Sequence, residues 1–343
     1  MSREVVPSTF AALRVDVCDG VVVRSVGQVE LATLPDGDVC VRVEYSSLNY
    51  KDALSASGNR GVTRNYPHTP GIDAAGVVVS SRDPAWAPGD QVLCTGFDLG
   101  MDTPGGFGEY IKVPGEWLVA LPDGVDARWA MAVGTAGLTA AIGLERLEAA
   151  GVTPDTGPLV VTGASGGVGS LGVAVLARAG FEVLASTGKD SARELLMGLG
   201  ANRVIPRSVL SEQTPEESKR PLLRAEYAGG LDTVGGSTLD KLIRQTAVGG
   251  AVAACGLVAG AGLNLTVHPF ILRGVALMGI SSQHLPARRR PALWNRMASE
   301  LLPPRVVATP GLVTEVGLSE LEACIESILA GGVTGRVLVR HGA

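Results

Sequence analysis

Residues 159–170 read LVVTGASGGVGS, and this stretch decides the fold class. A short β-branched run, Leu159–Val161, leads directly into four glycines within residues 163–169. Apolar residues then follow at helical spacing and predict one apolar helix face: Val168, Leu171, Val175 and Leu176. The order of strand, glycine loop and helix is typical of a site for the phosphates of a dinucleotide.

The small residues of this loop have separate physical roles. Gly166 allows the backbone to approach a pyrophosphate, and Gly169 allows the helix to pack closely against the strand. The N–H groups at the start of the helix carry partial positive charge and favour an anion. We therefore predict a phosphate cradle formed by Ser165, Gly166, Gly167 and Val168. The alternative is a tight strand-to-helix turn that binds nothing.

The loop belongs to a series of alternating strands and helices. Six strands are predicted, over residues 159–161, 182–185, 203–205, 231–234, 251–254 and 276–279. Strands separated by helices indicate βαβ units and a doubly wound parallel sheet. Near the end of the chain, residues 318–332 predict a helix that opens with a capping box from Ser319 to Glu322, and residues 335–339 predict a closing strand.

The residues before the loop have a different pattern. Short apolar runs separated by Gly, Pro and Asp predict strands of a β-rich domain, over residues 39–48, 74–81, 90–96, 109–113 and 117–122. Counted from Thr162, the glycine spacing also fits short-chain dehydrogenases, which use a downstream Tyr-x-x-x-Lys pair as general acid. The only downstream tyrosine is Tyr227, and Leu231 occupies the lysine position. The missing pair and the preceding β-rich domain exclude that class.

Composition limits the remaining function classes. The 343 residues are enough for two domains, and 46% hydrophobic against 18% charged residues indicate a well-buried chain. A net charge of −5 without a long basic run predicts no nucleic-acid or membrane partner. The first residues lack a secretory signal, no apolar stretch can span a bilayer, and the five cysteines form no C-x-x-C pair. We expect a cytoplasmic protein with free thiols.

Several motifs together identify a family resemblance. The clearest are SSLNYKDALSASG (46–58), PGIDAAGVVVSS (70–81), GGFGEYIKV (105–113), LDTVGG (231–236) and HPFILRGVALMGI (268–280). With the glycine loop, they resemble the medium-chain dehydrogenase/reductase superfamily, and within it the zinc-free quinone-oxidoreductase-like branch that includes acrylyl-CoA reductases. The resemblance implies an α/β fold with a GroES-like β-rich catalytic domain over residues 1–130. It implies a Rossmann NADP-binding domain with a six-stranded sheet over 131–282, and a return to the catalytic domain over 283–343.

Zinc is not expected. Alcohol-dehydrogenase relatives hold catalytic zinc with a Cys and a Gly-His-Glu, whereas the matching stretches here read SLNYKDA and PGIDAAG. Neither contains a thiolate or an imidazole, so three zinc ligands cannot be assembled. His68 lies nearby without partners in the sequence pattern, and we interpret it as a loop residue.

The cofactor is predicted from the end of the second strand. An acidic residue there would accept the ribose hydroxyls of NAD, but residues 184–193 read LASTGKDSAR, without an acid at the strand end. Thr187, Gly188 and Lys189 can instead hold the 2′-phosphate of NADP(H), with Arg207 closing on it. The alternative is that both basic side chains are merely solvated. The resemblance adds Leu257, Ile271 and Ser282 to the expected cofactor contacts.

The catalytic residues are predicted from the SLNYKDA motif. Hydride transfer to an activated alkene leaves negative charge on the adjacent carbonyl oxygen, which needs hydrogen-bond donors when zinc is absent. Asn49 and Tyr50 are the candidates, and the resemblance places Tyr50 beside the nicotinamide as well. Lys51 and Asp52 are either an ion pair that holds the loop or part of the chemistry.

The predicted activity is NADPH-dependent reduction of the C=C bond of a short acyl-CoA such as acrylyl-CoA, with hydride to the β-carbon and a proton to the α-carbon. Two alternatives are an NADPH:quinone oxidoreductase and an NADPH-binding protein with little turnover. Arginines 288–290 either bind CoA phosphates or are ordinary surface charges, and residues 281–284 depart from close relatives. The resemblance also implies a homodimer.

Overall fold

The structure, a computed structural model, describes residues 6–342, and these form two compact units. Unit 1 comprises the described residues up to Thr135 together with 283–298 and 313–342, and unit 2 comprises 136–282 and 299–312. Residues 299–312 thus group with unit 2 rather than with the rest of the predicted return segment. The bond from Arg178 Nε to the Glu300 carbonyl oxygen, 3.1 Å, ties this segment to unit 2.

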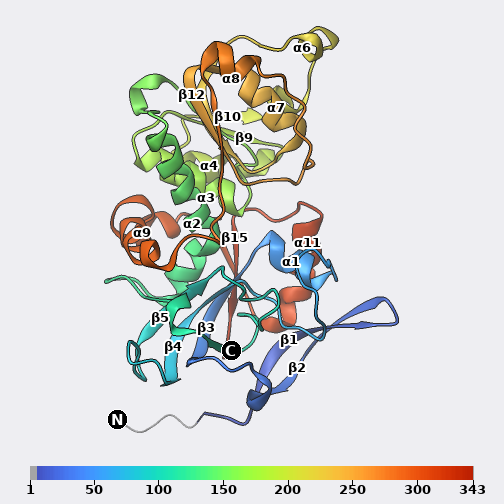
Figure 1. Ribbon diagram of the computed structural model, residues 1–343, viewed down its shortest axis with the longest axis vertical. Coiled ribbons are helices and arrows are strands. Elements are labelled where there is room, and N and C mark those ends of the chain that lie inside the picture. The colour runs from blue at the N-terminus through green and yellow to red at the C-terminus, as the bar shows by residue number, and fades with distance from the viewer. Residues whose placement is uncertain (1–5, 343) are drawn as a thin grey trace. The chain divides into compact units, whose positions relative to one another are not determined.

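Unit 2 is built on a six-stranded parallel sheet (Figure 1). Its strand order is β10-β9-β8-β11-β12-β13, which is the doubly wound order 3-2-1-4-5-6 along the chain. The strands are β8 (Leu159–Val161), β9 (Val183–Thr187), β10 (Arg203–Pro206), β11 (Tyr227–Asp232), β12 (Thr246–Ala254) and β13 (Ala276–Gly279). The predicted fold class is confirmed, and β11 and β12 begin four or five residues before their predicted starts.

Helices connect these strands and cover the sheet. They are α3 (Gly167–Arg178), α4 (Arg193–Gly198), α5 (Ser208–Ser211), α6 (Pro215–Lys219), α7 (Gly236–Gln245) and α8 (His268–Arg273). Val160, Leu184 and Val252 of the strands pack with Leu242 and Ile243 of α7 in a buried cluster. Strands covered in this way are apolar along their length, which explains their β-branched composition.

Unit 1 is β-rich (Figure 1). Its main sheet has the order β14-β15-β3-β4-β5-β7, with β6 paired to β3. The five predicted runs appear as β3 (Val39–Leu48), β4 (Asp73–Ser81), β5 (Gln91–Thr95), β6 (Tyr110–Val113) and β7 (Leu118–Ala120). They are preceded by a hairpin that was not predicted from the sequence, formed by β1 (Thr9–Cys18) and β2 (Val21–Glu30).

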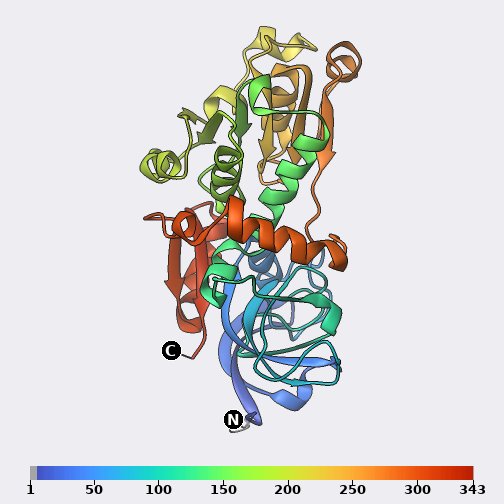
Figure 2. The same cartoon turned by 90° about the vertical axis from the view of Figure 1, so that its left-hand side faces the viewer.

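The last part of the chain completes this sheet. Strand β15 (Arg336–Arg340) pairs with β3 antiparallel and with β14 (Val313–Val316) parallel. The intervening helices are α9 (Arg290–Arg296), which continues into a π-helical segment (Met297–Leu301; Figure 2), α10 (Pro304–Val307) and α11 (Leu321–Leu329). The predicted capping box was wrong. A 3-10 turn, Leu318–Glu320, precedes α11, so Glu320 rather than Glu322 accepts the backbone bond, from Gly317 N at 2.9 Å.

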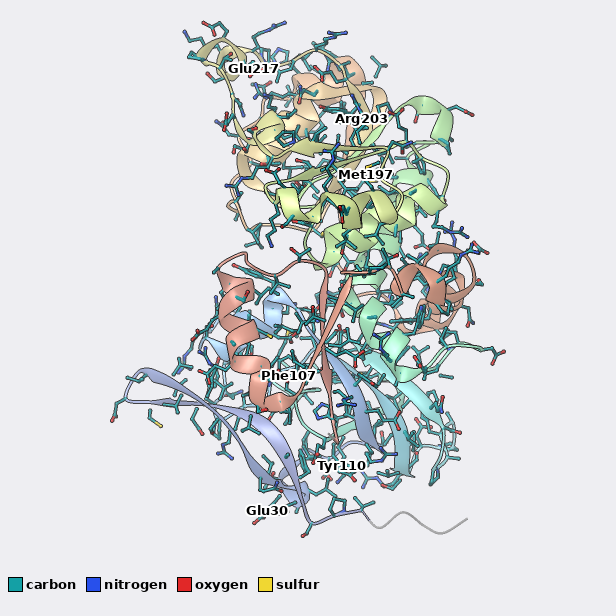
Figure 3. The ribbon with its side chains drawn as sticks, turned by 180° about the vertical axis from the view of Figure 1, so that it is seen from behind. Glu30, Phe107, Tyr110, Met197, Arg203 and Glu217 are labelled. Carbon is teal, nitrogen blue, oxygen red and sulfur yellow. The ribbon has the colours of Figure 1, made fainter. Side chains whose placement is uncertain are left out.

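Two further helices carry residues of unit 1. Helix α1 spans Tyr50–Ala56, and α2 spans Ala127–Ala149 with a non-helical residue at Gly134. Phe107 is fully buried between the sheet and α11, in a cluster with Leu48, Leu321 and Val337 (Figure 3). Among the described residues, no helix combines the length and the apolar character needed to cross a membrane.

Candidate active site

The glycine loop of unit 2 has the tight packing that its sequence predicts. Gly163 has a positive φ of 58°, and Gly169 packs against the start of the loop. A Cβ atom at Gly169 would lie 2.7 Å from Ala164 Cα and even closer to the Gly163 carbonyl oxygen, so only glycine fits. At Gly166 the same atom would meet only that oxygen, at 3.3 Å. Space for a pyrophosphate therefore remains in front of Gly166, where α3 begins.

Two hydroxyl groups connect this loop to the end of the next strand. Thr187 Oγ1 donates to Ser165 Oγ at 2.9 Å, and both side chains are buried. Thr187 Oγ1 also accepts from the backbone N–H of Lys189 at 3.1 Å. The structure thus brings together the predicted phosphate cradle and the predicted 2′-phosphate residues.

Arg207 lies beside the end of β9. Its backbone N–H donates to the Thr187 carbonyl oxygen at 2.9 Å. Its side chain covers Gly188, because a Cβ atom at Gly188 would lie 2.8 Å from Arg207 Cδ and 2.9 Å from Nε. Partial burial lowers the pKa of Lys189. The short Thr187–Lys189 segment therefore contains one basic residue, Lys189, and lies against a second, Arg207, a combination that suits a phosphate monoester.

The structure adds Asp232, which was not predicted as a site residue from the sequence. It is fully buried at the end of β11, and burial raises its pKa. Its carboxylate accepts from Thr162 Oγ1 at 2.7 Å and from Gly235 N at 2.8 Å. It therefore joins the start of the glycine loop to the turn after β11. The LDTVGG motif contains this signal, since a polar residue at the end of a buried strand needs partners.

The other cofactor residues implied by the resemblance are more dispersed. Leu257 follows β12 and is 60% exposed, and Ile271 on α8 is 70% exposed. Ser282 follows β13 and accepts from Thr139 Oγ1 at 3.0 Å. Leu257 packs against Gly235, since a Cβ atom at Gly235 would lie 3.1 Å from Leu257 Cα.

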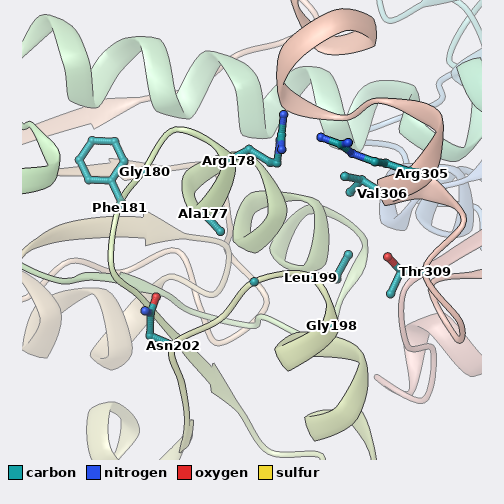
Figure 4. A pocket seen from close by; sticks show the side chains of 11 residues that line it. Ala177, Arg178, Gly180, Phe181, Gly198, Leu199, Asn202, Arg305, Val306 and Thr309 are labelled. Atoms are coloured by element: carbon teal, nitrogen blue, oxygen red, sulfur yellow. The ribbon is translucent and has the colours of Figure 1, made fainter.

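A hollow of about 530 Å³ in unit 2 is a separate feature (Figure 4). It lies at the last turn of α3 and the end of α4, with Arg178, Leu199 and Arg305 among its lining residues. Arg178 and Leu199 precede β9 and β10, whereas ligands of doubly wound sheets bind beyond the carboxyl ends of the strands. The glycine loop, rather than this hollow, is therefore the candidate cofactor site.

In unit 1, the side chain of Asn49 is held on both sides. Its Nδ2 donates to Asp73 Oδ2 at 2.9 Å and to Asp52 Oδ2 at 3.2 Å, and its Oδ1 accepts from Arg336 Nη1 at 3.1 Å. The neighbouring Tyr50 begins α1 and is 37% exposed. The amide of Asn49 is thus bound within the protein, while the Tyr50 side chain faces solvent.

Asp73 is the centre of this buried network. Its carboxylate accepts from Ser47 Oγ at 2.7 Å, from Thr135 Oγ1 at 2.6 Å and from Asn49 Nδ2. The Arg336 guanidinium lies 3.9 Å from Asp73 Oδ2 and donates to Ser47 Oγ at 2.8 Å. These hydrogen bonds and the opposite charge of Arg336 offset the free-energy cost of burying the Asp73 carboxylate.

Asp52 shares the same buried region. Its carboxylate accepts the backbone N–H groups of Asn49 and Ile72, both at 2.8 Å. Burial, with the nearby Asp73 charge, raises the pKa of Asp52 to about 7. Burial also lowers the pKa of Arg336. The network therefore combines two acids with one permanent cation.

Lys51 does not pair with Asp52, which corrects one of the two roles considered for it. Its Nζ instead donates to Gln283 Oε1 at 2.7 Å. Arg290 in turn holds the backbone of Gln283, because its Nη2 donates to the Gln283 carbonyl oxygen at 3.1 Å. Gly96 packs directly against Gln283, since a Cβ atom at Gly96 would lie 3.1 Å from Gln283 Cα.

Arg290 is neither a surface charge nor a free phosphate ligand. Its side chain is 1% exposed, and its Nη1 donates to the Thr95 carbonyl oxygen at 2.6 Å. Its guanidinium lies 4.1 Å from the centre of the Phe97 ring, which stacks on Trp117. Arg288 and Arg289 remain exposed in a 3-10 turn before α9.

Comparisons with known proteins give matches over both parts of the chain. The family models for the alcohol dehydrogenase GroES-like domain and for the zinc-binding dehydrogenase match residues 35–123 and 167–299. Acrylyl-CoA reductase AcuI of Ruegeria pomeroyi is 45% identical over 332 residues, which cover 96% of this chain and 98% of that protein. The chain belongs to the medium-chain dehydrogenase/reductase superfamily.

Other members of this medium-chain superfamily are similarly close. The Bacillus subtilis YhfP protein, which carries a quinone oxidoreductase name, is 43% identical over 90% of this chain and 91% of its own length. The crystal structure of Escherichia coli YhdH with bound NADPH has a TM-score of 0.91 and 46% identity, and covers 96% of this chain and 99% of that one.

The zinc ion implied by the name of the second family model does not fit the residues of this superfamily member. Asp73 already accepts three side-chain hydrogen bonds, and the Arg336 guanidinium beside it would repel a cation. Within residues 6–342, no group of three or more His, Cys, Asp or Glu side chains could hold a metal ion. The surroundings of Asp73 therefore do not fit a zinc ion.

Proposed function

We propose that the protein is an NADPH-dependent reductase of the C=C bond of a short α,β-unsaturated acyl-CoA. The observation that carries this proposal is the joining of the phosphate cradle at Ser165 to the basic segment at Lys189 and Arg207. This arrangement favours NADPH over NADH, because a 2′-phosphate offers oxygens for charge-assisted bonds. The 45% identity to an acrylyl-CoA reductase supports the substrate class.

NADPH would supply a hydride to the β-carbon of the substrate, and the protein would supply the remaining groups. Gly166, Gly167 and Val168 would hold the pyrophosphate, with Lys189 and Arg207 on the 2′-phosphate. The exposed Tyr50 would donate a proton to the α-carbon, a role worth about 10²- to 10⁴-fold in rate. Asn49 would act as a positioning residue, because its amide is held by Asp73 and Arg336.

NADPH:quinone oxidoreductase activity is the second candidate, supported by the name of the 43% identical YhfP. Rates of NADPH oxidation with acrylyl-CoA, crotonyl-CoA and a simple quinone separate the two functions. Turnover of a thioester well above that of the quinone is the expected result. Quinone turnover alone would favour the second candidate, and tight NADPH binding without any turnover would indicate a binding protein.

We further propose a homodimer in the cytoplasm. Strand β13 ends the sheet of unit 2, and apolar side chains near it are exposed, including Val267 (62%) and Leu272 (61%). Exposed apolar groups beside a sheet edge favour association with a second copy. Cysteines 18, 40, 94, 255 and 324 are free thiols, which is typical of a reducing compartment.

A further inference from the structure

Lys51 has an unusual environment for a lysine. Its side chain is half-buried on α1, next to Tyr50. Among the described residues, its ammonium has one hydrogen-bond partner, the neutral Gln283 Oε1 at 2.7 Å. An ammonium has three N–H donors, so two are left for other partners. Burying a charge without an opposite charge is unfavourable, which makes an anionic partner from outside the protein attractive.

The carboxylate next in sequence does not supply that partner. Asp52 points into the buried network, where Oδ1 accepts from Ile72 N and Oδ2 from Asn49 N. Asp52 therefore affects Lys51 only through space, and burial has the larger effect, lowering the pKa of Lys51. The positive charge of Lys51 stays incompletely compensated within the protein.

The orientation of Lys51 is fixed by a chain of contacts. Gln283 holds its Nζ, and buried Arg290 holds the Gln283 backbone. Arg290 is itself fixed by Thr95 and by the ring of Phe97. Rigid support of this kind is what an electrostatic catalytic group requires, because it removes the cost of reorganisation during the reaction.

We propose that Lys51 binds the carbonyl oxygen of the substrate and stabilises the negative charge that develops there. This inference rests on the proposed reductase function. When the β-carbon accepts the hydride, the electron pair of the C=C bond moves into an enolate, and its negative charge rests mainly on the thioester oxygen beside Lys51. The α-carbon then takes the proton of Tyr50, the C=O bond is restored, and Tyr50 regains a proton from the solvent, so each turnover consumes one hydride and one solvent proton. Lys51 keeps its proton throughout.

Binding of acetoacetyl-CoA to the cofactor-free protein tests this role without turnover. This thioester forms an enolate that absorbs in the near ultraviolet, and a cation at its oxygen increases the enolate fraction at fixed pH. The wild-type protein should show the enolate band, Lys51→Met should lose it, and Lys51→Arg should retain much of it. Lys112→Met is the matched control, since Lys112 is another half-buried lysine of unit 1.

Kinetics with NADPH and acrylyl-CoA give the second readout. Lys51→Met should lower kcat about 10²-fold or more, in the range found for loss of one oxyanion donor. Lys51→Arg should stay within about tenfold of wild type, and Gln283→Leu should show a smaller loss because only the support is removed. The dissociation constant of NADPH and the Tm should change little, whereas a purely structural role would change them.

Different results would contradict the role of Lys51 and the proposed reductase function. A wild-type protein without an enolate band, or a Lys51→Met variant with wild-type band and kcat, would overturn the role of Lys51. An enolate band that depends on Lys51, in a protein that reduces no enoyl thioester, would support Lys51 and overturn the proposed function.

Discussion

Residues around α1 are held by hydrogen-bond partners that are distant in the sequence. Asn49 and Tyr50 were predicted from a local motif, but Asp73 and Arg336, which hold Asn49, were not. They lie 24 and 287 positions from it, and no local pattern indicates such contacts. Arg290 was misjudged for the same reason, because its partner Thr95 is 195 positions away. The sequence therefore indicates the candidate residues of the local motif better than the distant residues that hold them in place.

Replacing Arg207 with Ala should weaken NADPH binding about tenfold to hundredfold. One charge-assisted hydrogen bond contributes about 1.5–3 kcal/mol. NADH lacks the 2′-phosphate and should bind the variant and the wild type equally. Fluorescence titration with both nucleotides measures the difference, with Arg203→Ala, an exposed residue of β10, as control. Equal losses for NADPH and NADH would contradict the assignment of Arg207.

Asp52 should make the stability of the protein depend on pH. Its pKa is about 7 in the folded protein and about 3.8 in an unfolded chain, so the folded state holds the proton more tightly. The stability that Asp52 contributes is therefore complete below about pH 4 and decreases as the pH rises to about 7. Urea denaturation at pH 5 and pH 8 should show a smaller decrease for Asp52→Asn than for wild type. Identical decreases would rule out a proton on Asp52.

At the scale of elements, the order of strands was predictable, whereas several ends were not. The glycine loop and its flanking strand and helix were predicted correctly because periodicity and glycine spacing are local signals. Strand β12 was predicted to begin at Ala251, because Gly249 and Gly250 are typical of a turn. In the structure it begins at Thr246. Thr246 pairs with Tyr227 and Ala251 pairs with Gly229, so both glycines lie in an irregular stretch between two paired parts of β12, and Gly249 has a positive φ of 72°. The turn-like signal is thus local to this irregularity, and pairing on both sides of it continues the strand.

Gly169→Ala should destabilise unit 2 by about 1–3 kcal/mol, as expected for overpacking against a fixed backbone. The added methyl group would lie against Gly163 and Ala164, which are both backbone contacts. Thermal unfolding followed by circular dichroism measures the loss of Tm. Gly166→Ala is the matched control, because its methyl group meets one atom at 3.3 Å and should leave the Tm nearly unchanged. Equal Tm values for the two variants would argue against close packing at residue 169.

At the scale of the whole molecule, the chain divides into two units, and near its end it returns to unit 1 twice. Residues 283–298 and 313–342 return to unit 1, while residues 299–312 belong to unit 2. Composition predicted a two-domain chain, and the family resemblance predicted a single return to the first domain after residue 282. The assignment of residues 299–312 to unit 2 was not predicted, because contacts such as that of Arg178 with Glu300 are not indicated by the sequence.

The proposed dimer predicts the behaviour of the whole molecule in solution. Light scattering during gel filtration should give a mass near twice the 35.2 kDa of one chain. Combining Val267→Asp with Leu272→Asp should shift the protein to monomers, because charges would replace exposed apolar groups beside the edge strand. A wild-type monomer at all concentrations would refute the dimer.

The position of Arg336 has a consequence for the order of events during synthesis. Asn49 leaves the ribosome 287 residues before the arginine that binds it. At elongation rates of about 5–20 residues per second, that interval is on the order of tens of seconds. Until Arg336 is synthesised, the Asp52 and Asp73 carboxylates lack its guanidinium as a counter-charge. The nascent chain can thus complete the sheet of unit 2 before unit 1 receives its last strand and the guanidinium that binds Asn49.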